Sequence, residues 1–286
     1  MARNYSVTDK SVKICIVTDM EGLAGVSHWD QCYAVDDQAA VYGEGLNQLA
    51  ADTNAAIAGC CDAGATEVVV WDGHGRNRQQ AFTRVPLDPR ASCQRLEHGY
   101  PLRLGGLDRS AAGVIMVGQH AMAGTLQGFL DHTQVPKEIC RYRINGEEHG
   151  EMSQFALQAG AFGVPLLHVS GDEALCAEAR RLFPWVATTP TKRGTGWASC
   201  ELYPVAEVRA RIRRDVAAAI AGRAAARPWS LPMPAEVSVE YAWSALADPI
   251  AAIPGVRRPH ARTVAWTITD PRFIYNWPSP DWHPTP

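Results

Sequence analysis

The sequence predicts an α/β fold, in which a largely parallel sheet is covered by helices, followed by a smaller C-terminal α+β domain. Apolar runs typical of buried strands alternate with helical patterns through the first part of the chain, as expected where helices cover both faces of a parallel sheet. Further on, apolar and polar residues alternate from Val237 to Trp243 and again from Val264 to Ile268. That period of two predicts half-buried, antiparallel strands.

Each element of the first part is predicted by its own pattern. Residues 12–19 form an apolar run that ends in a carboxylate, and residues 66–71 form a second run rich in valine. Between them, apolar side chains recur at helical spacing from Tyr42 to Cys60, which predicts a helix that ends at Gly64. The same reasoning predicts strands at 112–117 and 164–170, a helix at 151–160 and another that starts near Pro204.

The expected organisation of the chain has four segments. They are an N-terminal tail at 1–11, an α/β domain at 12–200 that carries the candidate site residues, a smaller α+β domain at 201–276 and a C-terminal tail at 277–286. A Pro-rich connector, residues 226–234, leads into the predicted strands of the smaller domain. The C-terminal tail carries Trp277 and Trp282 and could dock on a neighbouring subunit.

The composition indicates a soluble globular protein with a substantial core. Of its 286 residues, 47% are hydrophobic and 20% are charged, and the net charge is -3. This charge gives no electrostatic reason to expect nucleic acid or a membrane surface as a partner. The N-terminus contains no long apolar segment, so we expect a cytoplasmic location without an export signal or membrane span. The eight cysteines include no C-x-x-C pair, which favours free thiols.

Two carboxylates follow the first predicted strand. In Thr18-Asp19-Met20-Glu21-Gly22, Asp19 and Glu21 stand at i and i+2 and project from the same face of an extended chain. Two such carboxylates repel each other and resist burial, and a divalent cation is the simplest partner that keeps both ionised. The alternative is that Asp19 caps a helix and Glu21 is solvated.

Further potential ligands recur at the ends of the next predicted strands. His74 follows the second strand, His120 follows the third, and Glu151 opens a helix after a turn at Asn145-Gly146. The carboxyl ends of parallel strands meet at one edge of a sheet, so these side chains could converge with the carboxylate pair. Three carboxylates and two imidazoles suit zinc or another first-row divalent ion, and they suffice for two ions. Taken singly, each histidine could instead be a hydrogen-bonded residue and Glu151 a first-turn helix carboxylate.

One more histidine is a candidate catalytic residue. His132 follows the loop 121–129, which could fold it over the metals. An imidazole there that binds no metal can donate to a developing oxyanion or shuttle protons. The alternative is a loop histidine held by Asp131. His149, two positions before Glu151, is a further possible ligand, although a solvent-facing position at the helix start is the more ordinary expectation.

These motifs, in their order, resemble those of the zinc D-aminopeptidase family of the DppA type. They are Thr18-Asp19-Met20-Glu21-Gly22, Trp71-Asp72-Gly73-His74, Gly118-Gln119-His120-Ala121, Asp131-His132-Thr133 and Gly150-Glu151. The resemblance implies a binuclear zinc aminopeptidase whose metal ligands are Asp19, Glu21, His74, His120 and Glu151. It further implies that Asp19 bridges the ions, that His132 is catalytic, and that Glu151 is a possible general base.

The same resemblance implies how the protein assembles and what it cleaves. Members of the family form a decamer of two stacked pentameric rings around a channel that admits short peptides. The expected substrates carry an N-terminal D-amino acid, as in D-Ala-D-Ala. Two divalent ions lower the pKa of a bound water towards neutrality, so that it attacks the scissile carbonyl.

Two departures from the family pattern leave the substrate open. The family has serine on both sides of the catalytic histidine, whereas this chain has Asp131-His132-Thr133, whose carboxylate is expected to raise the pKa of the imidazole. Aromatic walls that line a different pocket could come from the tryptophans of the C-terminal third, which are Trp229, Trp243, Trp266, Trp277 and Trp282.

Three other functions follow as alternatives. The nearest is an amidohydrolase of the same fold that acts on a non-peptide amide or a specialised small metabolite. A metal-binding module without catalysis is the second. A phosphoesterase is the weakest, because the sequence contains no recognisable phosphate-binding loop.

Overall fold

In the computed structural model, the described residues are 11–33, 39–75, 80–94 and 106–276. Their strands form two sheets, one of seven strands and one of five. The predicted α/β fold with a largely parallel sheet and a set of antiparallel strands is confirmed. All eight cysteines lie in the described residues and are free thiols, as expected. The two predicted tails, apart from Ser11, lie outside the described residues, and with them Trp277 and Trp282.

The larger sheet contains the four strands predicted in the first part of the chain and three that were not predicted. The predicted strands are β1 (Lys13–Thr18), β2 (Glu67–Asp72), β4 (Ala111–Gln119) and β7 (Leu166–Asp172), and the others are β3 (Ser92–Gln94), β8 (Ala187–Gly196) and β9 (Ser199–Leu202). Their order is β3-β2-β1-β4-β7-β8-β9, and every neighbouring pair is parallel except β8 and β9. β1 therefore lies inside the sheet, and all six of its residues are buried.

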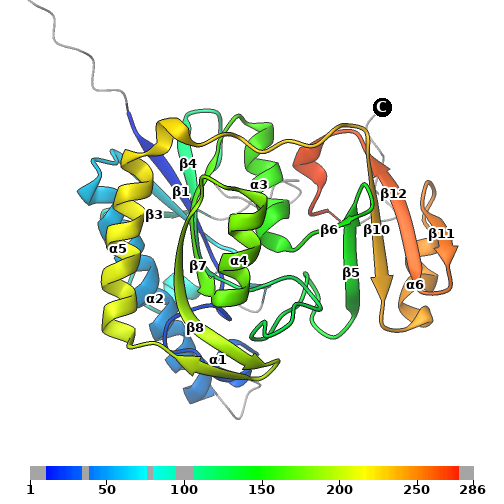
Figure 1. Cartoon of the computed structure of the whole chain (residues 1–286), viewed down its shortest axis with the longest axis horizontal. Helices are drawn as coiled ribbons and strands as arrows, with labels where there is room; N and C mark the ends of the chain where they lie inside the picture. The colour runs from blue at the N-terminus through cyan, green and yellow to red at the C-terminus, as the bar shows by residue number, and fades with distance from the viewer. Residues whose placement is uncertain (1–10, 34–38, 76–79, 95–105, 277–286) are drawn as a thin grey trace, which may run out of the picture.

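Helices cover both faces of this sheet (Figure 1). They are α1 (Asp30–Tyr33), α2 (Ala39–Asp62), α3 (Glu151–Ala161), α4 (Glu173–Leu182) and α5 (Val205–Ala221). Figure 1 shows α2 and α5 on one side of the sheet and α3 and α4 on the other. Within the described part of the chain, no helix is both long and apolar enough to cross a membrane.

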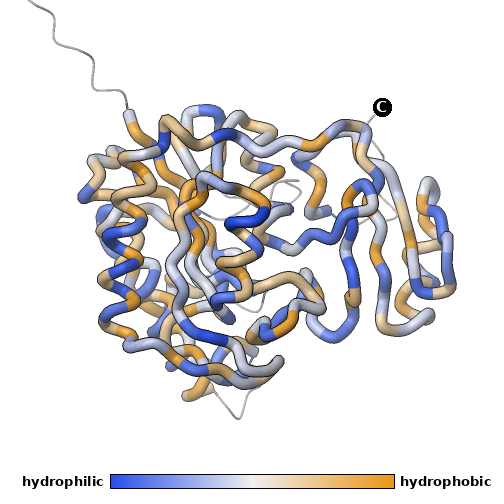
Figure 2. Tube along the Cα trace, viewed as in Figure 1, coloured by the Kyte–Doolittle hydropathy of each residue, from blue (hydrophilic) through white to orange (hydrophobic). Residues whose placement is uncertain are grey.

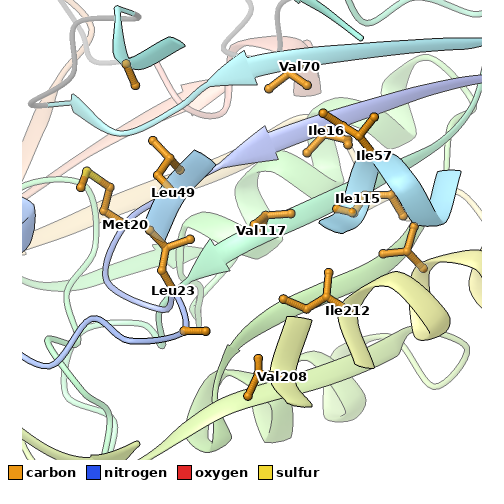
Figure 3. Packing of buried hydrophobic residues seen from close by; sticks show 14 of the residues in the cluster. Ile16, Met20, Leu23, Leu49, Ile57, Val70, Ile115, Val117, Val208 and Ile212 are labelled. Carbon is orange, nitrogen blue, oxygen red and sulfur yellow. The ribbon is translucent and has the colours of Figure 1, made fainter. Parts of the chain in front are cut away.

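Side chains that alternate along the strands fill the two layers between sheet and helices. Ile16 of β1 packs in the cluster formed with α2 and α5, whereas Val17 belongs to the cluster formed with α3 and α4. Figure 3 shows the first cluster, in which Ile16 and Ile115 of the sheet lie near Ile57 of α2 and Ile212 of α5. Hydrophilic and hydrophobic residues alternate along the trace of α5 (Figure 2), as expected for a helix with one face on the core.

The smaller sheet is antiparallel and lies at the other end of the molecule in Figure 1. In the order β11-β12-β10-β5-β6 it contains β11 (Arg257–His260), β12 (Thr263–Ile268), β10 (Ala235–Tyr241), β5 (Ile139–Ile144) and β6 (Glu147–Glu148). Helix α6 (Ser244–Ala251) and the short 3-10 turns η3 (Ala81–Thr83), η4 (Arg223–Ala225) and η5 (Pro271–Phe273) complete the described elements. Asn145 and Gly146 join β5 to β6 with φ of 52° and 87°, the left-handed pair that a tight hairpin requires.

Two features of the chain cross the boundary that the sequence suggested at residue 200. β5 and β6, residues 139–148, belong to the smaller sheet, where β5 pairs with β10 and β6 pairs with β5. Conversely, Val208 and Ile212 of α5 pack in the core of the larger sheet. The strand period predicts a strand without saying which partner it pairs with, and the helical period likewise does not say which sheet the helix covers. The division into 12–200 and 201–276 stays a prediction.

Candidate metal centre

The carboxyl edge of the larger sheet carries four of the predicted ligands. Asp19 follows β1 directly and Glu21 lies two residues further on. His74 lies two residues after β2, and His120 follows β4 directly. Because β2, β1 and β4 are neighbours in the sheet, segments far apart in the sequence end side by side. All four side chains are buried.

The backbone after β1 is fixed against the end of β4. The N–H of Asp19 donates to the carbonyl of Val117, and the N–H of Gly22 donates to that of Gly118, both at 2.8 Å. Gly118 has a φ of 75°, and a Cβ there would lie 2.3 Å from the carbonyl oxygen of Asp19. A Cβ on Gly22 would lie 1.8 Å from the carbonyl oxygen of Gln119. Both positions therefore require glycine if the carboxylates are to reach β4.

Five of the predicted residues form a compact group, here called the donor cluster, which comprises Asp19, Glu21, His74, His120 and Glu151. Nε2 of His74 lies 3.4 Å from Oε1 of Glu21. Nε2 of His120 lies 3.5 Å from Oδ2 of Asp19 and 3.5 Å from Oε1 of Glu151. Two ligand atoms on one tetrahedral zinc ion, each at about 2.0–2.2 Å, are roughly 3.3–3.5 Å apart. The spacing of the donor cluster therefore fits a bound metal ion.

Two groups of potential ligand atoms overlap in this region. Oxygen and nitrogen atoms of Asp19, Glu21 and His120 lie within 4.8 Å of one another, and those of His120, His132 and Glu151 form a second such group. Nε2 of His132 is 3.8 Å from Oε1 of Glu151. The structure thus brings His132 to the donor cluster, as expected, and sequence reasoning did not anticipate that it is near enough to share a ligand group.

The hydrogen bond of His120 leaves its other ring nitrogen directed at the carboxylates. Nδ1 of His120 lies 3.0 Å from the carbonyl oxygen of Ala121, which can only accept, so Nδ1 carries the proton of the neutral ring and Nε2 is unprotonated. Among the described residues, Nε2 of His120, both ring nitrogens of His74 and Oε1 of Glu21 are buried without a hydrogen-bond partner. Buried polar atoms are rarely left in this state. A cation among them would satisfy Nε2 of both imidazoles and Oε1 of Glu21, although not Nδ1 of His74.

The charges of the donor cluster lead to the same conclusion. Burial and the negative charge of Glu21 raise the pKa of Asp19 well above its usual value. Burial opposes ionisation of Glu21, but the charge of His74 outweighs it and holds the pKa of Glu21 well below its usual value. Burial also opposes ionisation of Glu151, and the imidazole of His120 nevertheless lowers its pKa to about 2. Without a cation the cluster needs bound protons, and a divalent ion can replace them.

Glu151 is held by residues that are distant in the sequence. It is the first residue of α3, as predicted, and it is buried. Its Oε1 accepts the backbone N–H of Gln134 at 2.7 Å, and its Oε2 accepts the hydroxyl of Tyr275 at 2.7 Å. Both oxygens are therefore oriented by the protein. Nothing in the local sequence of Gln134 or Tyr275 indicated these contacts.

His132 presents one defined nitrogen to the site. Its Nδ1 lies 2.8 Å from the carbonyl oxygen of Leu130, so the neutral ring has its lone pair on Nε2. Burial and the charge of His120 lower the pKa of His132 to about 4. The expectation that Asp131 raises this pKa is wrong, because the Asp131 carboxylate instead accepts the N–H of Gly124 at 2.6 Å. A backbone carbonyl therefore orients the imidazole of His132, whereas the carboxylate of Asp131 stabilises the loop 121–129 through Gly124.

Two other expectations are corrected by the structure. His149 is buried rather than solvent-facing, with Nδ1 3.2 Å from Oγ of Ser153 and its ring beside Trp229. It belongs to neither group of ligand atoms in the described residues. Of the described tryptophans in the C-terminal third, Trp266 is buried in the core of the smaller sheet, whereas Trp243 is exposed. Two tyrosines lie beside the donor cluster instead: Tyr275, which donates to Glu151, and Tyr33 from the N-terminal part of the chain.

Tyr33 is the residue beside the site that sequence reasoning missed. Its hydroxyl lies 3.3 Å from Nε2 of His132, and its ring centroid lies 4.9 Å from that of His74. Because Nε2 of the neutral imidazole can only accept, the hydroxyl is the donor. Burial raises the pKa of Tyr33, which keeps the phenol protonated. The only signal in the sequence was the helical spacing of Trp29 and Tyr33, whose rings stack at 4.0 Å.

The segment that follows β1 is also held from β8. The ammonium group of Lys192, which is fully buried, donates to the carbonyl oxygens of Glu21 at 2.5 Å and Val26 at 2.6 Å. Thr191 donates its hydroxyl to the carbonyl oxygen of Gly22 at 2.6 Å. Burial lowers the pKa of Lys192 to about 8. Two neighbouring side chains of β8 thus fix the backbone on which Glu21 stands.

Comparisons with known proteins agree with this geometry. The family model Peptidase_M55, described as D-aminopeptidase, matches residues 12–279. The chain is 27% identical over 244 residues to the D-aminopeptidase of Bacillus subtilis (strain 168), a match that covers 85% of this chain and 86% of that protein. It is also similar to the solved structure of the Zn-dependent D-aminopeptidase DppA from Bacillus subtilis, a self-compartmentalizing protease. That likeness has a TM-score of 0.84 at 27% identity and covers 92% of this chain and 94% of the other.

Proposed function

Because the chain belongs to the D-aminopeptidase family Peptidase_M55 and is therefore a peptidase, we propose that it releases the N-terminal D-amino acid from short peptides such as D-Ala-D-Ala. The observation that carries the proposal is the donor cluster, in which Nε2 atoms of two buried imidazoles lie 3.4–3.5 Å from buried carboxylate oxygens. The similarity to a Zn-dependent relative supports zinc as the metal.

In this proposal two zinc ions per chain are held by Asp19, Glu21, His74, His120 and Glu151. Three carboxylates and two neutral imidazoles are ligands that zinc accepts. The ligand atoms fall in two overlapping groups, and because the one free nitrogen of His120 can bind a single ion, a second ion would depend on the carboxylates. Asp19, which stands between β1 and β4 and faces His120, is the carboxylate we assign as the bridge.

His132 is the residue we assign to proton transfer. Zinc ions supply Lewis-acid chemistry, because they polarise the scissile carbonyl and lower the pKa of a water molecule. The unprotonated Nε2 of His132 can take a proton from the attacking water and pass it to the nitrogen of the leaving amine. Glu151 stays the alternative base, although both of its oxygens already accept hydrogen bonds from Gln134 and Tyr275. The hydroxyl of Tyr33 donates to the same Nε2, so it has to release this nitrogen before His132 accepts a proton.

We further propose that the chain assembles into a homodecamer of two pentameric rings. The similarity to a self-compartmentalizing protease supports an oligomer. Native mass spectrometry would give the subunit number directly, and a monomer at micromolar concentration would reject the ring assembly. The cytoplasmic location expected from the sequence stays a prediction.

One observation supports a second candidate function, the hydrolysis of a non-peptide amide. Two indoles and a phenol, of Trp29, Trp197 and Tyr33, form contacts next to the histidines of the site. Such a surface also suits a non-peptide amide with an aromatic group. Membership of a peptidase family argues against a metal-binding module without catalysis.

The test is a matched panel of substrates on protein whose metal content is measured in the same sample. D-Ala-D-Ala, L-Ala-L-Ala and the p-nitroanilides of D- and L-alanine separate stereospecificity from leaving-group preference. The proposal expects zinc in the sample and turnover of the D-substrates well above that of the L-substrates. Turnover of neither D-substrate by zinc-loaded protein would reject it in favour of another amide.

A further inference from the structure

Three aromatic side chains from two separate segments form a continuous surface, here called the aromatic wall, of Trp29, Tyr33 and Trp197. The rings of Trp29 and Tyr33 stack with centroids 4.0 Å apart, and Trp29 meets Trp197 at 5.4 Å. Trp29 and Tyr33 lie just before and within α1, whereas Trp197 lies in the turn between β8 and β9. Ring contacts therefore connect two parts of the chain that are far apart in the sequence.

The aromatic wall begins at the donor cluster and ends in solvent. At its inner end, Tyr33 contacts the rings of His74 and His132, with centroids at 4.9 Å and 6.4 Å. At its outer end, Trp197 is 39% exposed. The N–H of Leu130 donates to the carbonyl of Trp197 at 2.7 Å, and the indole N–H of Trp197 donates to the carbonyl of Asp131 at 3.1 Å. The loop that carries His132 and the outer end of the wall are thus joined.

A lysine lies on the aromatic wall. The ammonium nitrogen of Lys137 is 4.8 Å from the ring centroid of Trp29 and 5.7 Å from that of Trp197. Among the described residues no acidic group pairs with it, whereas the nearby exposed Arg193 pairs with Glu201 at 2.6 Å. Indole faces hold a cation in place without neutralising its charge. Lys137 can therefore still pair with an anion that arrives from solvent.

The segment that carries Lys137 is fixed to the donor cluster. Gln134 donates its backbone N–H to Glu151 and its side-chain amide to Gln154 at 2.6 Å. Gln134 and Lys137 both have positive φ, 61° and 67°, so this turn has a defined left-handed shape at two points. The turn therefore places the ammonium group of Lys137 on the aromatic wall, next to the segment whose Gln134 orients Glu151.

We infer that the aromatic wall and Lys137 bind the part of the substrate on the leaving-group side of the scissile bond, with Lys137 paired to the free C-terminal carboxylate of a short peptide. This inference rests on the proposed function, because a peptidase that takes short peptides meets a carboxylate near the bond it cuts. A dipeptide spans only about 7 Å, so its carboxylate stays close to the site, whereas longer peptides carry it further away. The ring surface contacts the side chain of the residue that leaves.

The test compares two substrates that differ only in that carboxylate, D-Ala-D-Ala and its C-terminal amide, on Lys137→Met and the wild-type enzyme with matched zinc content. The inference expects Lys137→Met to lower kcat/KM for the acid roughly tenfold, mainly through KM, because a charge-assisted pair is lost. Turnover of the amide should change less than about twofold, within the scatter of exposed substitutions. Lys137→Arg should retain most of the preference for the acid.

Arg193→Met is the matched control, because it removes one exposed positive charge from the adjacent hairpin without touching the aromatic wall. It should leave the ratio of the two substrates unchanged. An equal loss for acid and amide in Lys137→Met, or the same loss in Arg193→Met, would overturn the inference and leave the proposed function standing. Turnover of neither compound by the wild-type enzyme would overturn both.

Discussion

The donor cluster and the aromatic wall meet at Tyr33, yet the chain builds them by opposite means. The donor cluster consists of buried side chains on strand ends and the first turn of a helix, fixed by backbone hydrogen bonds and by Lys192. The wall consists of rings from α1, the residue before it and the turn between β8 and β9, which touch one another and reach solvent at Trp197. From this difference we expect metal binding and substrate choice to depend on separate residues. Substitutions in the donor cluster should therefore change metal content and turnover, whereas substitutions in the aromatic wall should change the choice of substrate.

We expect the largest loss of zinc and of activity from a substitution at the centre of the donor cluster. His120→Ala removes the imidazole that both groups of ligand atoms share. We expect loss of bound zinc and a fall in turnover of at least about a thousandfold, because the ligand set is broken at its common member. Inductively coupled plasma mass spectrometry and the D-Ala-D-Ala assay measure the two effects. His260→Ala, an exposed histidine of β11 in the smaller sheet, is the control and should change neither.

The next substitution, at His132, distinguishes a role in proton transfer from a role in metal binding. His132→Ala should lower kcat by about a hundredfold or more, the usual contribution of a general acid–base group. If the donor cluster holds the zinc, metal content stays within experimental error of the wild type. A nearly unchanged rate would remove His132 from the mechanism. Loss of zinc together with activity would instead make His132 a ligand, as its place in the second group of ligand atoms allows.

We expect an intermediate loss of stability and of zinc affinity when Lys192, which stabilises the backbone beside Glu21, is replaced. Lys192→Met leaves the buried carbonyl oxygens of Glu21 and Val26 without their donor. We expect a loss of about 1–3 kcal/mol in the free energy of unfolding of the metal-free protein, the usual cost of an unsatisfied buried group. Zinc affinity, measured by competition with a chelator, should weaken as well. The neighbouring Arg193→Met removes only an exposed ion pair and should cost less than about 1 kcal/mol.

We expect the smallest loss of activity at Tyr33, where the donor cluster and the aromatic wall meet. Tyr33→Phe keeps the ring stacked on Trp29 and removes only the hydroxyl that donates to His132. We expect kcat to fall by roughly three- to tenfold, the worth of one modest hydrogen bond, with unchanged zinc content and an unchanged ratio of acid to amide turnover. A shift in that ratio would show that the phenol hydroxyl belongs to substrate recognition, and the separation of the two regions would then be incomplete.

The donor cluster could be predicted from the sequence because its members follow a rule of position. Asp19, Glu21, His74 and His120 come at or just after the ends of parallel strands, and such ends meet at one edge. Glu151 opens a helix, a place where carboxylates are favoured. Each residue was visible through its local pattern, and the expectation that these residues meet at one edge of the sheet needed no knowledge of the strand order.

The residues around the donor cluster could not be predicted in that way. Lys192 reaches the β1 segment from another strand, Tyr275 comes from the C-terminal region, and Gln134 uses its backbone N–H. Contacts of this kind depend on the tertiary arrangement of segments and leave no period or motif in the sequence. The same reason explains the wrong expectation for Asp131, whose carboxylate turns to the N–H of Gly124. Sequence adjacency to His132 did not imply contact.

The central claim is that the donor cluster holds the zinc ions on which peptide cleavage depends. The most direct measurement removes metal with a chelator and adds zinc back stepwise, while D-Ala-D-Ala cleavage and bound zinc are followed in the same sample. We expect no turnover in the metal-free protein and a return of activity that saturates at two zinc ions per chain. Full turnover by metal-free protein, or zinc binding that restores no cleavage of the D-peptide, would contradict it.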